Sequence, residues 1–239
     1  MSLENKRVVV AGGSSGIGFA TAAAAAAQGA EVIIASRNAE RVSAALKNLP
    51  SGTQGDAVDF TDEAQVKAWF AKIGAFDHLV YTAGETLQLG LLADTEVETA
   101  RRAFEVRYWG AFKVIKHGHA SIRQGGSIVL TTGIAGLRPA KGWTVPSSTL
   151  GAMESLTRAL AIELAPLRVN AVSPGVVRSP LWDNMSEADR QAMYTRFAAA
   201  LPTGCIGEPE DIAQTYLYLM QERYSTGQMI VVDGGGVLV

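Results

Sequence analysis

Glycines and serines between residues 12 and 18 have the spacing of a phosphate-binding turn. The segment is Gly12-Gly13-Ser14-Ser15-Gly16-Ile17-Gly18, and it follows the β-branched run Val8–Val10. Glycines let backbone N–H groups come close to a pyrophosphate, and a helix N-terminus adds unsatisfied donors and a positive dipole end. The hydroxyls of Ser14 and Ser15 can donate to the same anion. A simple glycine turn would look similar, but the buried strand before it and the alanine-rich helix after it favour nucleotide binding.

The end of the next predicted strand bears on which nucleotide would bind. This strand, Val32–Ala35, is followed by Ser36 and Arg37 and by no carboxylate. An acidic side chain here would hydrogen-bond the ribose hydroxyls of NAD, whereas a guanidinium beside a hydroxyl suits the additional phosphate of NADP. We therefore expect NADP(H) to bind more tightly than NAD(H). An arginine that only stacks on adenine would be compatible with either nucleotide.

Buried strands alternate with helices along the chain, and this order predicts the scaffold of the site. Strands are expected at 8–10, 32–35, 78–82, 127–131, 168–173 and 228–232, with a short one ending at 57–60. Helices are expected at 21–28, 39–49, 62–73, 146–164 and from Pro209, with a long helix at about 95–120 interrupted by Gly110 and Gly118. This alternation predicts an α/β protein with a single-domain Rossmann fold, a doubly wound parallel sheet of about seven strands with helices on both faces. We expect one NAD(P)-binding domain across residues 1–239.

The topology also predicts where the binding residues meet. Right-handed crossovers place the C-terminal ends of parallel strands at one edge of the sheet. The glycine turn, Arg37, Asp59 and Ala83-Gly84 all follow such ends. They should therefore converge on one crevice.

Residues 183–202 follow a later strand and form a different kind of element. Met193, Phe197 and Leu201 recur at helical spacing and give one apolar stripe. We expect this segment to cover the crevice over a substrate. An ordinary amphipathic surface helix would have the same stripe.

Composition excludes several classes of partner. The 239 residues are 48% hydrophobic, and 21 Lys+Arg against 23 Asp+Glu give a net charge of −2. This charge does not attract nucleic acid or an anionic membrane, and no apolar run reaches membrane-spanning length. Cys205 is the only cysteine, and the N-terminus has no apolar signal core, so we expect a cytoplasmic protein without an internal disulfide. His78, His117 and His119 lack a third ligand in register, so no metal site is expected.

Further ordered segments carry a family resemblance. After the turn at Gly12–Gly18 come Asp59, Ala83-Gly84, Arg168–Gly175 with Ser179, and finally Thr226–Gln228 and Asp233–Gly235. In this order they resemble the motifs of the classical short-chain dehydrogenase/reductase family from end to end. The resemblance implies that Asp59 contacts adenine and that Ser179 contacts the nicotinamide-side phosphate. The expected cofactor-binding residues are Gly12, Ser14, Ser15, Gly16, Ile17, Gly18, Ser36, Arg37, Asp59, Phe60, Ala83, Gly84, Pro174, Gly175, Val177 and Ser179.

The catalytic positions depart from the family pattern. Such enzymes use a tyrosine, a lysine four residues later, a serine and an asparagine. The aligned positions here hold Pro146, Leu150, Gly133 and Arg107 in turn. No tyrosine lies between residues 109 and 194 and no lysine follows Lys141. The acid/base mechanism usual in the family is therefore not expected, because Ser and Thr hydroxyls near Pro146 are poor acids at neutral pH.

Arg107, Thr132 and Lys141 are the remaining catalytic candidates near the mouth of the crevice. Arg107 could bind a substrate carboxylate or polarise a carbonyl oxygen. The alternative is an Arg107–Glu85 ion pair that only fills the space left by asparagine. Lys141 could supply the missing cation, or it could be a solvated loop lysine.

Three functions are compatible with this pattern. The first is an atypical NADP-dependent reductase or dehydrogenase that transfers hydride to or from a small carbonyl or alcohol substrate, which could be anionic. The second is a non-catalytic NADP-binding scaffold or redox sensor, and the third is a lyase or isomerase on the same fold. The segment 176–179 favours the first, because a mere adenine binder would not need a nicotinamide end. The resemblance also implies a homo-oligomer, a tetramer or dimer, formed by the long helices around Phe104 and Met153 and by the C-terminal strand.

Overall fold

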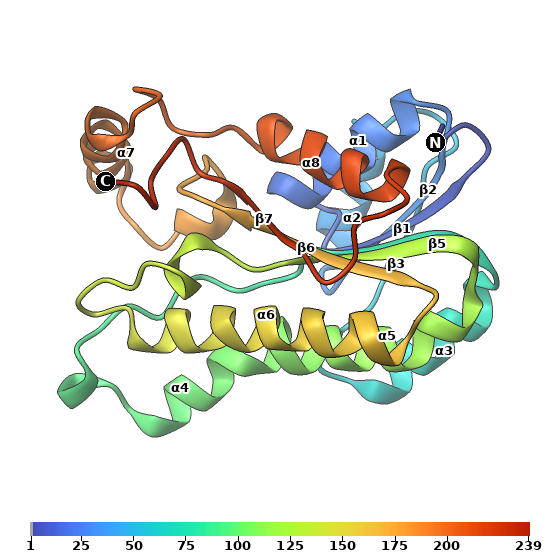
Figure 1. The fold of residues 1–239 in the computed structure, drawn as a ribbon, viewed down its shortest axis with the longest axis horizontal. Helices are drawn as coiled ribbons and strands as arrows, with labels where there is room; N and C mark the ends of the chain where they lie inside the picture. The colour runs from blue at the N-terminus through green and yellow to red at the C-terminus, as the bar shows by residue number, and fades with distance from the viewer. Residues whose placement is uncertain (1) are drawn as a thin grey trace.

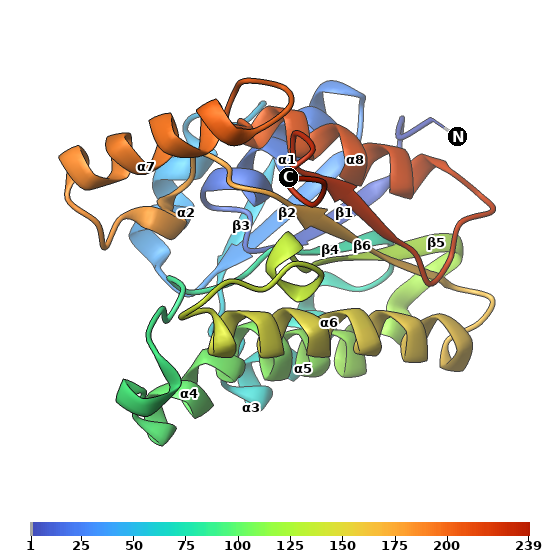
Figure 2. The ribbon, with the colours of Figure 1, turned by 60° about the vertical axis from the view of Figure 1, so that its left-hand side comes forward.

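The computed structural model describes residues 2–239 and consists of one parallel sheet of seven strands between two layers of helices (Figures 1 and 2). The strand order β3-β2-β1-β4-β5-β6-β7 confirms the predicted doubly wound Rossmann fold. The strands are β1 (Arg7–Ala11), β2 (Glu31–Ser36), β3 (Gln54–Ala57), β4 (Phe76–Tyr81), β5 (Ile122–Thr131), β6 (Arg168–Pro174) and β7 (Met229–Val232).

Helices cover both faces of this sheet. The upper layer of Figure 1 contains α1 (Gly16–Ala27), α2 (Ala39–Leu46) and α8 (Pro209–Gln221). The lower layer contains α3 (Glu63–Ile73), α4 (Val97–Phe104), α5 (Ala111–Gly118) and α6 (Thr144–Glu163). The remaining helix, α7 (Glu187–Ala200), stands apart from both layers at the left of Figure 1. Short 3-10 turns lie at Leu92–Asp94, His119–Ser121, Ile134–Gly136 and Pro180–Trp182.

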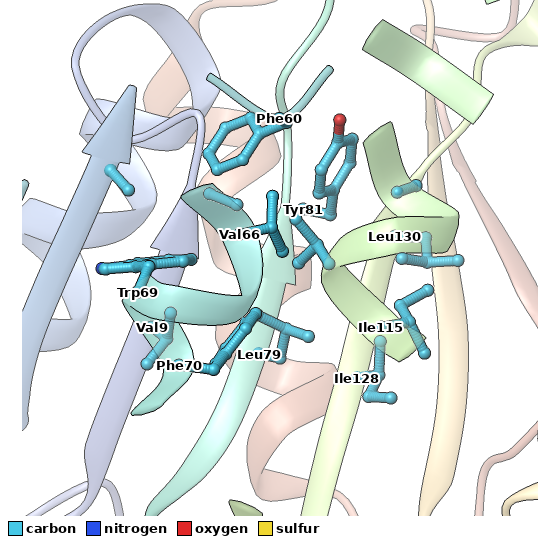
Figure 3. Packing of buried hydrophobic residues seen from close by; sticks show 14 of the residues in the cluster. Val9, Phe60, Val66, Trp69, Phe70, Leu79, Tyr81, Ile115, Ile128 and Leu130 are labelled. Atoms are coloured by element: carbon cyan, nitrogen blue, oxygen red, sulfur yellow. The ribbon is translucent and has the colours of Figure 1, made fainter. Parts of the chain in front are cut away.

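The core has two halves, one on each face of the sheet. Val9 of β1 belongs to the cluster between the sheet and helices α3, α5 and α6. Val8 and Val10 belong to the cluster between the sheet and helices α1 and α8. Figure 3 shows the first cluster, in which Phe60 and Tyr81 lie side by side. Each fully buried large side chain contributes roughly 1.5–3 kcal/mol to folding. Because helices cover both faces, the central strands are buried on both sides and largely apolar, and this made them recognisable in the sequence.

Helix α1 lies close to the sheet because the residues at its start and on its buried face are small. Ala22 is fully buried against this face. Gly12 has a φ of +100°, and a Cβ there would lie 2.5 Å from the backbone nitrogen of Ala83. A Cβ at Gly18 would overlap both the carbonyl oxygen of Gly12 and the hydroxyl of Thr82. The glycine spacing therefore sets the distance between the turn and the neighbouring strand end.

The predicted long helix at 95–120 is divided into three parts. A π-helical turn, η2 (Glu105–Gly110), joins α4 to α5. The hydroxyl of Tyr81 on β4 donates a hydrogen bond to the carbonyl oxygen of Val106 and lies against Gly110, where a Cβ would overlap it. The wider turn thus leaves room for the Tyr81 hydroxyl, so the interruption at Gly110 is explained by a tertiary contact with β4.

Helix α7 lies over the C-terminal end of the sheet. Met193, Phe197 and Leu201, the predicted stripe, pack in a third apolar cluster with Val176 and Trp182. Figure 2 shows α7 extending beyond the two main layers. In the part of the chain that the structure describes, no helix combines the length and apolar character needed to cross a bilayer.

Candidate active site

A large crevice of about 1780 Å³ opens at the C-terminal ends of the strands. It includes the point between β1 and β4 where the strand order reverses, which is where ligands bind in open α/β sheets. Every residue predicted to bind the cofactor lines this crevice, from Gly12 to Ser179. So do Arg107, Thr132 and Lys141. The convergence inferred from the topology is therefore present, while cofactor binding by each of these residues stays a prediction.

The glycine turn leaves polar groups at the N-terminus of α1 available to a ligand. Ser15 is the N-cap residue, and its side chain makes no capping hydrogen bond. Ser14 and Ser36 face each other from the turn and from β2, with their hydroxyl oxygens 2.8 Å apart. An uncapped helix N-terminus with two adjacent hydroxyls suits a phosphate group, so the crevice fits a dinucleotide at this end.

The adenosine end contains a carboxylate that the sequence argument did not place there. The Nη1 atom of Arg37 lies 3.5 Å from Oε1 of Glu85, and both side chains are largely solvent-accessible, with exposed fractions of 65% and 45%. Arg41 of α2 lines the crevice on the same side. Glu85 was considered only as a partner of Arg107; its position directly after β4, two strands from Arg37, is the signal that could have placed it here.

Asp59 has a fixed orientation at this end. One carboxylate oxygen accepts hydrogen bonds from the backbone N–H of Thr61 at 2.9 Å and from its hydroxyl at 2.8 Å. The other carboxylate oxygen has no hydrogen bond within residues 2–239. The side chain can therefore accept a hydrogen bond from an adenine amino group, as the family resemblance implies.

Arg107 extends from the π-helical turn to the middle of the crevice. Its Nη2 donates to the backbone carbonyl of Glu85 at 3.0 Å, and a Cβ on Gly84 would lie 2.7 Å from its Cζ. The guanidinium is thus half-buried on a bare glycine backbone. Burial lowers the pKa of Arg107, while nearby Tyr81 and Glu85 act in the opposite direction. A guanidinium stays protonated in proteins, so the group is a fixed cation.

The Arg107–Glu85 ion pair considered from the sequence is not present. The two residues do meet, but through the backbone carbonyl of Glu85, and its carboxylate pairs with Arg37 instead. The nitrogens of Arg107 that do not bind this carbonyl remain available to a ligand, since among residues 2–239 the guanidinium has no carboxylate within ion-pair distance.

The other three aligned positions are filled by apolar packing. Leu150 is 5% exposed, and its Cδ1 would lie 3.2 Å from a Cβ on Gly133. Pro146 is buried in the first turn of α6. Leu150 therefore occupies the space beside Gly133, and the two positions are matched in size.

Comparison with known proteins places this geometry in a family. A family model described as "Enoyl-(Acyl carrier protein) reductase" matches residues 11–236. The short-chain dehydrogenase/reductase fsr5 of Gibberella fujikuroi is 34% identical over 254 residues, covering 99% of this chain and 96% of the relative. The chain belongs to the short-chain dehydrogenase/reductase family.

Solved structures of short-chain dehydrogenases/reductases have the same fold over their whole length. The crystal structure of a small-chain dehydrogenase in complex with NADPH is 37% identical with a TM-score of 0.85, covering 99% of this chain and 100% of that one. The structure of MalC Reductase/Diels-Alderase from Malbranchea aurantiaca is 30% identical with a TM-score of 0.91, covering 99% of this chain and 98% of that one. These relatives are dehydrogenases and reductases, and the NADPH complex shows that one of them binds a nicotinamide cofactor, which agrees with the crevice described above.

Thr132 and Lys141, the other catalytic candidates, have different surroundings in this short-chain dehydrogenase/reductase. Thr132 is 3% exposed, and its hydroxyl donates to the backbone carbonyl of Leu150 at 3.0 Å. This bond uses its only proton and ties β5 to α6, so the geometry argues for a structural role and against the catalytic one. Lys141 is exposed on the loop before α6 and has no ion-pair partner among residues 2–239.

Two buried tyrosines lie near Arg107 but do not replace the family's catalytic tyrosine. Burial raises the pKa of both Tyr81 and Tyr216. The hydroxyl of Tyr81 is bonded to Val106, and that of Tyr216 lies 2.6 Å from the hydroxyl of Thr131. Tyr81 comes from β4, whereas Tyr216 comes from α8, in the helix layer that also contains α1 and α2.

The outer wall of the crevice is apolar. Leu87, Trp143 and Met185 line it together with Met193 and Phe197 of α7. No group of three potential metal ligands occurs among residues 2–239. His78 instead lies buried 2.9 Å from the Ser127 hydroxyl, and burial lowers its pKa to about 4. These apolar side chains of the outer wall suit an apolar substrate body, and Arg107 lines the same crevice.

Proposed function

We propose that this chain is an NADP-dependent reductase or dehydrogenase of small carbonyl or alcohol substrates that works without the tyrosine–lysine pair of its family. The observation that carries the proposal is the half-buried guanidinium of Arg107, which lies on Gly84 with no carboxylate at ion-pair distance among residues 2–239. It lines the same crevice as all the residues expected to bind the cofactor. Gly133, Pro146 and Leu150 offer no proton donor at the aligned positions.

The residues present fit the cofactor. The N-terminus of α1 with Ser14 and Ser15 would hold the pyrophosphate, and Arg37 with Ser36 the additional phosphate of NADP. The segment Pro174–Ser179 would hold the nicotinamide end. When bound, the nicotinamide cofactor supplies or accepts the hydride. The binding of NADPH by a related dehydrogenase of 37% identity supports this assignment.

Arg107 supplies the electrostatic part of the reaction. A charge-assisted hydrogen bond from its free nitrogens would stabilise the negative charge that develops on a carbonyl oxygen, or hold a substrate carboxylate. With no acid at the position of Pro146, the proton would come from water. Helix α7, with its stripe of Met193 and Phe197, would cover the substrate and limit further access of water.

Two alternatives remain distinct from this proposal. A scaffold or redox sensor would bind NADP without any turnover. A lyase or isomerase would use Arg107 to polarise a carbonyl while the cofactor stays fixed. The related MalC is described as both a reductase and a Diels-Alderase, which supports a non-redox activity on this fold. The two are separated from the proposal by whether NADPH is consumed.

We also propose a cytoplasmic homo-oligomer, a dimer or tetramer. Its support is an exposed aromatic series along η2 and α5, in which Trp109 and Phe112 stack edge to face with centroids 6.0 Å apart. Exposed aromatic clusters of this kind are common at protein interfaces.

The test of the proposed function is NADPH consumption. The purified chain is incubated with NADPH and a panel of aldehydes, ketones and keto acids, and the absorbance of NADPH is followed at neutral pH. The proposal expects turnover that Arg107→Asn reduces. Tight NADPH binding without consumption by any substrate class would instead favour the scaffold.

A further inference from the structure

Glu85 reaches across the crevice to the residue expected to bind the NADP phosphate. Arg37 follows β2 and Glu85 follows β4, with β1 between these strands. Their side chains meet with Nη1 and Oε1 3.5 Å apart, and both residues line the crevice. The pair therefore bridges the space at the adenosine end of the site.

The backbone of Glu85 is held in place while its side chain stays free to turn. Its carbonyl accepts the hydrogen bond from Arg107 at 3.0 Å, and Arg107 packs on the neighbouring Gly84. The carboxylate itself is half-exposed and has only Arg37 as an ion-pair partner among residues 2–239. Exposed pairs of this kind are weak, so a phosphate can displace the carboxylate.

Arg41 gives the phosphate a second cation that Glu85 does not engage. It lines the crevice from α2, and its guanidinium has no ion-pair partner in the described chain, residues 2–239. Its backbone N–H is bound by Asn38 at the helix N-cap, which fixes where the side chain begins. A phosphate bound here could contact both Arg37 and Arg41, but Arg37 would first have to break its ion pair with Glu85.

We propose that Glu85 is a specificity-determining residue that competes with the 2′-phosphate of NADP for Arg37 and so reduces the preference for NADP over NAD. The inference rests on the proposed function, in which Arg37 binds that phosphate. NAD has a hydroxyl in place of the phosphate and does not compete for Arg37. The Glu85 carboxylate can also accept a hydrogen bond from that hydroxyl of NAD, as acidic residues do in NAD-specific sites. Glu85 thus weakens the binding of NADP without weakening the binding of NAD.

Nucleotide titrations of the full chain test this directly. Dissociation constants for NADPH and NADH are measured by fluorescence for the wild type, Glu85→Gln, Arg37→Ala and the double variant. Glu85→Gln keeps the size of the side chain and removes its charge. Glu40→Gln is the matched control, because Glu40 is an exposed carboxylate three residues from Arg37 that does not pair with it.

The proposal expects Glu85→Gln to tighten NADPH binding about threefold to tenfold while NADH binding stays unchanged or weakens. This gain should vanish in the Arg37→Ala background, and Glu40→Gln should change NADPH binding less than about twofold. The proposal fails if Glu85→Gln leaves NADPH binding unchanged while Arg37→Ala weakens it, and the NADP assignment then stands. It also fails if Glu40→Gln has the same effect as Glu85→Gln, because general charge is then the cause. If Arg37→Ala has no effect on NADPH binding, the NADP assignment itself fails and Glu85 loses its role with it.

Discussion

The two ends of the crevice differ in what lines them: close-packed glycine backbone where the proposed cofactor phosphates would lie, and mainly side chains where the proposed substrate would lie. A Cβ has no room at Gly12 because of the Ala83 backbone, and none at Gly18 because of the Gly12 carbonyl and the Thr82 hydroxyl. At the other end, Leu150 packs against Gly133, and the guanidinium of Arg107 lies on Gly84. A backbone site tolerates few sequences, while a side-chain site can be rebuilt by matched substitutions. One fold can therefore keep its cofactor end and change its chemistry.

The largest effect is expected from placing a lysine where the family has one. Leu150→Lys would bury an ammonium in the packed space against Gly133, and should lower the free energy of unfolding by about 3 kcal/mol. Chemical denaturation measures this. Leu150→Met is the volume-matched control and should cost less than about 1.5 kcal/mol. An unchanged stability in Leu150→Lys would mean that the position is not packed, and the contrast between the two ends would be lost.

The phosphate end should be most sensitive at Gly18. In Gly18→Val the side chain would overlap the Gly12 carbonyl, and the displaced turn should weaken NADPH binding by at least about a hundredfold, near 2.7 kcal/mol. Fluorescence titration gives the affinity. Gly151→Ala is the control, because a Cβ at Gly151 of α6 meets no atom within 4 Å. Retained affinity in Gly18→Val would show that the turn does not hold the pyrophosphate.

A smaller effect is expected at Arg37, where the ligand meets a side chain at the cofactor end. Arg37→Ala should weaken NADPH binding about tenfold, near 1.4 kcal/mol, and leave NADH within about twofold. The loss should decrease as salt is raised, because Arg37 is exposed. Equal losses for both nucleotides would assign Arg37 to stacking on adenine.

The smallest effect is expected at the hydroxyls of α6. Ser148 donates to the carbonyl of Thr144 at 2.8 Å, and Ser147 is a buried hydroxyl without a partner among residues 2–239. Neither replaces the family's tyrosine, so Ser147→Ala and Ser148→Ala should each keep turnover within about threefold. A loss beyond about a hundredfold in kcat, the lower end of a general acid's contribution, would show that one of them transfers the proton.

Much of the fold could be predicted because its signals are local. The β-branched runs mark the strands, the glycines mark the turn, and their alternation gives a parallel sheet whose ends converge. The break in the helix at 95–120 was expected at Gly110, but its π-helical form depends on Tyr81, which is distant in sequence. Only a tertiary contact decides between a simple end and a wider turn.

The sequence predicted which residues line the candidate site better than it predicted which of their atoms contact one another. An Arg107–Glu85 ion pair was one of two alternatives; the two residues do meet at this edge of the sheet, but not as an ion pair. Which atom of Glu85 Arg107 would contact was not predictable, since Arg37 competes for the carboxylate from another strand. The role suggested for Thr132 also depended on one unseen contact, its bond to the Leu150 carbonyl.

The most direct test of the central claim, that Arg107 carries the chemistry at the substrate end, is a comparison of turnover and binding in Arg107→Asn. Steady-state oxidation of NADPH with the best carbonyl substrate is measured alongside the NADPH dissociation constant and the Tm, with Arg107→Lys as the variant that keeps the charge. The account predicts a fall in kcat/KM of about a hundredfold for Arg107→Asn, partial rescue by Arg107→Lys, and NADPH affinity within about twofold of wild type. A lowered Tm with substrate turnover unchanged would contradict it and make Arg107 a structural residue.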